Sequence, residues 1–79
     1  MRAEDMQEIL EARPFKPFRL HLTDGEAFDI THPELVMQTR SKLIVDLPPR
    51  QGSRIVEHVE HCALMHVVRV EELEAGTPS

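Results

Sequence analysis

Residues 18–30 read FRLHLTDGEAFDI, and they contain the strongest structural signal in the chain. Phe18, Leu20 and Leu22 alternate with polar side chains, and the alternation resumes after the turn and continues to Ile30. A period of two is typical of a strand with one buried face. The central Asp-Gly pair favours a tight turn, because glycine adopts a positive φ without steric cost. This stretch therefore predicts a β-hairpin.

The segment before the hairpin predicts a short helix over residues 3–12 (AEDMQEILEA). Met6, Ile9 and Leu10 recur at helical spacing and form one narrow apolar stripe. A helix of this length is not stable alone in water, so we expect the stripe to pack on the rest of the protein. Pro14 ends the helix, because the residue before a proline is biased away from the α conformation.

Shorter elements are expected between the helix and the C-terminal block. Residues 14–18 (PFKPF) form an extended connector, in which Phe15 is expected to hold the helix against the sheet. The remaining assignments, in chain order, are a bend at 31–34 (THPE), a strand at 35–38, a turn at 40–42, a strand at 43–47 and a loop at 48–53 (PPRQGS).

Residues 54–73 (RIVEHVEHCALMHVVRVEEL) allow two interpretations. Valines and an alanine recur at helical spacing, which permits an amphipathic helix of twenty residues. The many β-branched residues favour strands instead. We prefer a strand over 54–60, a turn over 61–64 and a strand over 65–71.

These assignments predict a mainly β (α+β) fold. A short N-terminal helix is followed by a five-stranded antiparallel small barrel of the SH3-like or Sm-like type, which leaves few free strand edges. Residues 1–73 are expected to form one domain, and residues 74–79 a frayed tail.

Size and composition limit the classes of function. The chain has 79 residues, a formal net charge of −5 and a single cysteine, Cys62, so no disulfide forms within it. A lone cysteine and the absence of an apolar leader or membrane span indicate a soluble, cytoplasmic protein. A core this small gives marginal stability, which predicts a homo-oligomer.

The C-terminal histidines are the first candidates for a metal site. His58, His61 and His66 lie close in sequence to Cys62, and Glu57 and Glu60 accompany them. On a strand, however, His58 and His61 point to opposite faces, and a second pair of ligands is missing elsewhere. We therefore predict no metal site and expect exposed or edge histidines.

No catalytic or cofactor site is predicted either. Apolar neighbours make Cys62 a buried, unreactive cysteine. The chain has too few glycines, widely separated, for a nucleotide-binding loop. The remaining carboxylates are assigned to turns and solvated surface: Asp24, Glu26, Asp29, Glu34, Asp46, Glu71, Glu72 and Glu74.

Four residues form the candidate surface for RNA or a protein partner. Arg19, His21 and Arg69 fall on outward positions of the first and last strands, and Phe15 is near them in the sequence pattern. An aromatic and basic surface of this kind suits single-stranded nucleic acid. The net negative charge opposes binding to RNA phosphates.

Two resemblances follow from the motifs. PFKPFRLHLTDG, HPELVM and LMHVVRVEEL resemble a family of short, uncharacterised bacterial proteins, a resemblance that covers most of the chain and implies no activity. The element order is more weakly similar to the Sm-like RNA chaperone Hfq, which implies RNA binding by a ring. This chain departs from that pattern where His61 and Cys62 replace a Lys-His pair.

Two functions remain open. The first is a non-enzymatic interaction or assembly module that self-associates or binds a protein through its strand edges. The alternative is a Sm-like, Hfq-type RNA-binding regulator.

Overall fold

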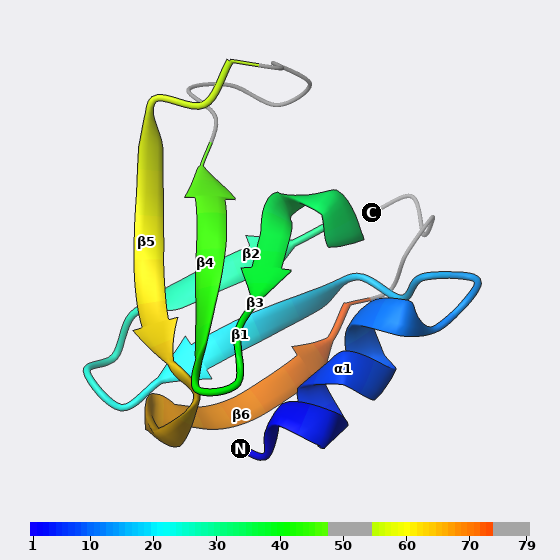
Figure 1. The fold of residues 1–79 in the computed structure, drawn as a ribbon, viewed down its shortest axis with the longest axis horizontal. Coiled ribbons are helices and arrows are strands. Elements are labelled where there is room, and N and C mark those ends of the chain that lie inside the picture. Colours follow the sequence, from blue (N-terminus) through cyan, green and yellow to red (C-terminus); the bar gives the residue numbers. More distant parts are fainter. Residues whose placement is uncertain (48–54, 74–79) are drawn as a thin grey trace.

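The computed structural model describes residues 1–47 and 55–73. In these residues the helix α1 and six strands follow one another, with two single 3-10 turns between strands (Figure 1). Their bounds are α1 Ala3–Glu11, β1 Phe18–Leu22, β2 Ala27–Ile30, η1 Pro33–Leu35, β3 Val36–Gln38, β4 Lys42–Leu47, β5 His58–Ala63, η2 Leu64–His66 and β6 Val67–Glu72. The loop predicted over 48–53 and the tail predicted over 74–79 lie outside the described residues.

The helix and the hairpin are confirmed. Met6 on α1 is fully buried, and Arg13 donates hydrogen bonds to the carbonyls of Leu10 and Ala12 at the end of the helix. Strands β1 and β2 pair antiparallel, and the intervening turn is closed by a hydrogen bond from the Gly25 amide to the Leu22 carbonyl. Gly25 has a φ of 89°, so it adopts the positive φ predicted for this turn. Glycine adopts this conformation without steric cost because it has no side chain.

The mainly β fold with one short N-terminal helix is confirmed, but the prediction of a five-stranded barrel is wrong. The described residues form six strands in two three-stranded antiparallel sheets, with the orders β2-β1-β6 and β3-β4-β5. The residues between β2 and β3 form the turn η1, which begins at Pro33. Proline has no amide hydrogen to donate to a ladder, so the extended chain is interrupted here and its two halves join different sheets.

The core lies between the two sheets and under α1. In Figure 1 the strands β4 and β5 run steeply across β1 and β6, so the sheets face each other. Alternate residues point inward, as the period of two predicts: Phe18 and Leu20 from β1, Leu43 and Val45 from β4. The remaining buried residues are Met6, Ile30, Cys62, Leu64 and Val67.

The C-terminal block forms strand, turn and strand, and the helical alternative is wrong. The turn η2 is centred on Met65, later than the predicted turn over 61–64. Strand β5 continues to Ala63 because its whole length pairs with β4, from Leu47 opposite His58 to Lys42 opposite Ala63.

In the described part of the chain, no helix has the length and apolar character needed to cross a membrane.

Candidate functional site

Three of the four candidate surface residues lie together on the outer face of the β2-β1-β6 sheet. Arg19 and His21 alternate with the buried residues of β1, and β6 pairs with β1 so that Arg69 lies opposite His21. Sequence alternation is enough to place Arg19 and His21 outward. It does not predict that they lie beside Arg69, because that depends on the pairing of β1 with β6, which are about fifty residues apart in the chain.

Two carboxylates complete this cluster, and the sequence analysis assigned both to ordinary solvated surface. Arg19 lies opposite Asp29 on one side and opposite Glu71 on the other. Its Nε donates to Asp29 Oδ1 at 2.6 Å and its Nη2 to Asp29 Oδ2 at 3.1 Å, a bidentate pair. We call Arg19, His21, Asp29, Arg69 and Glu71 the outer-face cluster.

His21 has two alternative partners within this cluster. Its Nε2 is 2.9 Å from Glu71 Oε1 and 3.1 Å from Arg69 Nη2. With a hydrogen on Nε2 the ring donates to Glu71, and without one it accepts from Arg69. Arg69 also lies 3.4 Å from Glu71 Oε1, so the guanidinium keeps a partner in both cases.

The basic side chains of the cluster are neutralised by its acidic ones. The hydrogen bond from Arg19 lowers the pKa of Asp29, and the bond to His21, together with Arg69 and Arg19, lowers the pKa of Glu71. Both carboxylates are therefore ionised at neutral pH and balance the two arginines. The resulting surface has little excess positive charge to offer a phosphate.

Phe15 belongs to the packing of the core. Its ring centroid is 6.1 Å from that of Phe18, with the planes tilted by 58°. It is half-buried and packs against the core cluster. An aromatic ring in such contacts has lost part of the surface on which a base would stack.

Cys62 is buried, as predicted, and it is a poor nucleophile. Cys62 is 4% exposed, and this burial raises the pKa of its thiol. The negative charges of Glu60 and Asp24 raise that pKa further. The neighbouring histidines bond elsewhere: Lys42 Nζ lies 3.2 Å from His61 Nδ1, and Thr23 Oγ1 lies 3.3 Å from His66 Nδ1. A thiol with a raised pKa carries little of the reactive thiolate.

The C-terminal histidines are all exposed, and they do not converge. His58 bonds to Glu60 on its own strand at 3.0 Å, and His61 and His66 have the partners named above. Across residues 1–47 and 55–73, no three histidine, cysteine, aspartate or glutamate side chains are grouped so that they could hold a metal ion.

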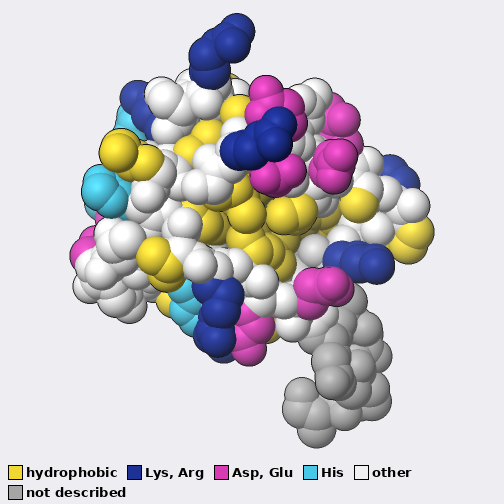
Figure 2. Space-filling view, turned by 90° about the horizontal axis from the view of Figure 1, so that it is seen from below, with side chains coloured by type: hydrophobic (Ala, Val, Ile, Leu, Met, Phe, Trp, Pro, Cys, Tyr) yellow, Lys and Arg dark blue, Asp and Glu magenta, His cyan; other side chains and the backbone are white. Residues whose placement is uncertain are grey.

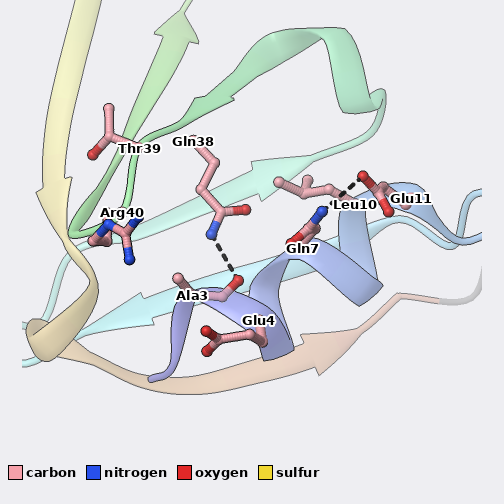
Figure 3. Close-up of a pocket in the computed structure, with 8 residues that line it drawn as sticks. All are labelled: Ala3, Glu4, Gln7, Leu10, Glu11, Gln38, Thr39 and Arg40. Atoms are coloured by element: carbon pink, nitrogen blue, oxygen red, sulfur yellow. Dashed lines mark hydrogen bonds between the residues drawn. The ribbon is translucent and has the colours of Figure 1, made fainter.

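A cleft of about 520 Å³ lies between α1 and the turn from β3 to β4 (Figure 3). Two of its glutamine side chains bond within the fold. Gln38 Nε2 donates to the Ala3 carbonyl at 2.7 Å, and Gln7 Nε2 to Glu11 Oε2 at 3.2 Å. Thr39, Glu4 and Glu11 are the lining residues with nucleophile or base chemistry. The Thr39 hydroxyl donates to the Lys42 carbonyl at 3.3 Å, and Glu11 accepts from Gln7.

A more apolar groove of about 410 Å³ lies between α1 and β6. Ile9, Ala12, Phe18 and Val70 contribute to its lining, with charged residues beside them. Figure 2 shows hydrophobic side chains gathered in the middle of the face seen from below, with acidic side chains next to them. This surface combines apolar and charged side chains, as contact regions between proteins do.

Exposed apolar side chains mark a further surface, on the β3-β4-β5 sheet. Met37 on β3 is 65% exposed and Val59 on β5 is 43% exposed. The register places Met37 beside Ile44, and Val59 beside Asp46 on the next outward position of β4. Met37, Ile44 and Val59 therefore run diagonally across the outer face of this sheet and reach its β5 edge.

No family model, curated protein or solved structure matches this chain.

Proposed function

We propose that this chain is a non-enzymatic assembly module that self-associates through the edge of β5. Within the described residues β5 pairs with β4 on one side only, and it forms the outer margin of its sheet in Figure 1. An edge strand presents a row of N–H and C=O groups that another strand can pair with. The β5 edge is therefore a surface to which a further strand can be added.

The observation that carries this proposal is the exposed Val59 in the middle of β5. Natural edge strands are commonly protected by lysine or proline. Strand β5 (HVEHCA) contains neither, whereas β6 (VVRVEE), the edge of the other sheet, has three charged residues in six. Pairing along β5 would cover Val59 and extend the apolar diagonal from Met37 across the join.

The small size of the chain supports the same conclusion. A domain of this length buries a smaller fraction of its surface than a larger one, and oligomerisation is one of the usual compensations. A single strand edge is a small interface, so we expect association in the micromolar range.

The test is the mass in solution over a range of protein concentrations, for the wild type and two variants. Val59→Lys puts a charge in the middle of the edge and is expected to weaken association by about tenfold or more. Val68→Lys is the matched control, because Val68 is an exposed valine on the β6 edge. It is expected to leave association unchanged.

Two results would contradict the proposal. One is a monomer mass for the wild type at about 100 µM, well above the expected dissociation constant. The other is equal weakening by both variants. Circular dichroism of the variants verifies that each is folded, which the exposed positions of both valines favour.

RNA binding is the second candidate function. It is supported by the meeting of Arg19, His21 and Arg69 on one sheet face. It ranks second because Asp29 and Glu71 neutralise that face.

A further inference from the structure

The side chains of β5 are self-complementary in one antiparallel register. A two-fold axis perpendicular to the sheet brings two β5 edges together with their outer faces on the same side. Each residue then lies opposite one on the same face of the second copy. The register is fixed by which residue lies on the axis.

Four positions of the axis can be compared. An axis at Glu60 places two carboxylates opposite each other, and an axis at His61 places Glu60 opposite Cys62. An axis at His58 places Glu60 opposite Val56 and Glu57 opposite Val59, so neither carboxylate faces an imidazole. Directly opposed like charges destabilise a strand pair, and unpaired carboxylates at an interface lose solvation.

An axis at Val59 gives each residue near the centre of the strand a favourable partner on the second copy. Val59 faces its own equivalent, His58 faces Glu60 of the second copy, and Glu57 faces His61. Within one chain His58 Nε2 already lies 3.0 Å from Glu60 Oε1. Assembly would join two such pairs into a group of four with alternating imidazole and carboxylate.

We propose that two copies of this chain pair antiparallel along β5, with Val59 opposite Val59 of the second copy. This inference rests on the proposed self-association and adds the partner surface and its register. The two β3-β4-β5 sheets would join into one continuous sheet. Its outer face would carry both apolar diagonals from Met37 to Val59, meeting at the axis.

Cysteine cross-linking tests the register directly. In a Cys62→Ala background, Val59→Cys places two thiols on directly opposite residues, whose Cα atoms are about 4.5–5.5 Å apart in antiparallel strands. That separation lies within the range of disulfides. We expect mild oxidation to convert Val59→Cys almost completely to a covalent dimer.

His61→Cys in the same background is the matched control. In the proposed register, His61 is four positions away from its own equivalent, about 13 Å along the strand, so it is expected to remain uncrosslinked. A mixture of the Glu57→Cys and His61→Cys proteins is expected to give a mixed disulfide dimer, because these positions face each other.

A charge exchange provides an independent readout without cysteine. His58→Glu places two carboxylates opposite each other and is expected to weaken association by about tenfold. Adding Glu60→Lys places opposite charges across the join and is expected to return the affinity to within about threefold of wild type. The His58 side chain is 63% exposed and that of Glu60 43%, and neither residue belongs to the core, so the exchange leaves the core untouched.

The possible failures are distinguishable. A dimeric mass in which Val59→Cys does not cross-link, or in which His61→Cys alone does, overturns the register while the proposed function stands. A monomeric wild type overturns both. Failure of Glu60→Lys to rescue His58→Glu also contradicts the register.

Discussion

At the scale of single residues, the outer-face cluster shows that side chains on neighbouring strands can neutralise the charge of a basic residue. Arg19 and Arg69 have the residue type expected for phosphate binding, but each lies within hydrogen-bond distance of a carboxylate. Asp29 and Glu71 are supplied by different strands, β2 and β6. The charge presented by this face is therefore set by pairing across three strands, and the residue types on β1 alone do not determine it.

The Arg19–Asp29 pair predicts a specific pH dependence of stability. The hydrogen bond from Arg19 holds the pKa of Asp29 below its ordinary value. The unfolded state then binds more protons in acid, so the stabilisation is present above the unfolded pKa of about 3.9 and is lost as the pH falls through the folded pKa. Asp29→Asn removes this contribution.

We expect Asp29→Asn to cause a small decrease in the urea midpoint at pH 7, because the pair is solvent-exposed. The difference from wild type should shrink toward zero as the pH is lowered to about 2. Glu34→Gln is the control, since Glu34 is exposed and makes no hydrogen bond or ion pair with the described residues. A constant difference at all pH values would show that the asparagine acts through packing.

At the scale of elements, local sequence patterns were sufficient to predict a strand when the strand that pairs with it is near in the sequence. The hairpin at 18–30 was predictable because its register follows from the alternation and from the Asp-Gly turn. The turn after β5 was placed too early, because pairing with β4 extends β5 to Ala63. The β1–β6 pairing joins segments about fifty residues apart, and no local pattern specifies it.

The hairpin turn gives a prediction at this scale. Gly25 has a φ of 89°, and a Cβ built there would have no atom within 4 Å. The cost of Gly25→Ala therefore comes from backbone conformation alone, about 1–2 kcal/mol of unfolding free energy. Gly25→Asn should cost less, because asparagine tolerates positive φ better.

Urea denaturation of the three proteins measures this order. Equal stability of Gly25→Ala and wild type would mean that the turn relaxes to a negative φ. A loss for Gly25→Asn as large as that for Gly25→Ala would also contradict the conformational explanation.

At the scale of the whole molecule, division into two sheets determines which surfaces are available. Among residues 1–47 and 55–73, the two three-stranded sheets have four edge strands, β2, β6, β3 and β5, where a closed barrel would have none. Gln38 at the end of β3 is tied to α1 by its hydrogen bond to Ala3, and β6 carries charges. Strand β5 carries the exposed Val59 in its middle and contains neither lysine nor proline. The sequence predicted self-association from size, but the edge that we propose for it could be identified only from the strand order.

The charge of the molecule predicts how it behaves toward RNA. With a net charge of −5 and a neutralised outer-face cluster, the wild type should show no saturable binding to single-stranded oligo-U or oligo-A at 50 mM salt. Asp29→Asn combined with Glu71→Gln removes the two neutralising charges and leaves Arg19 and Arg69 without a carboxylate partner. Any latent affinity of this face should therefore be greater in the double variant, and fluorescence anisotropy measures it.

The dependence on salt separates the two candidate functions. A phosphate-binding surface gives a log–log slope of about −0.7 for each phosphate neutralised on a single strand. Wild-type binding with such a slope, abolished by Arg19→Ala and Arg69→Ala but unaffected by Val59→Lys, would favour RNA binding over assembly. We expect the opposite pattern, in which Val59→Lys changes the mass in solution and neither arginine does. Arg19 and Arg69 are held by pairs within one chain, whereas the edge of β5 has the groups that a second copy can satisfy.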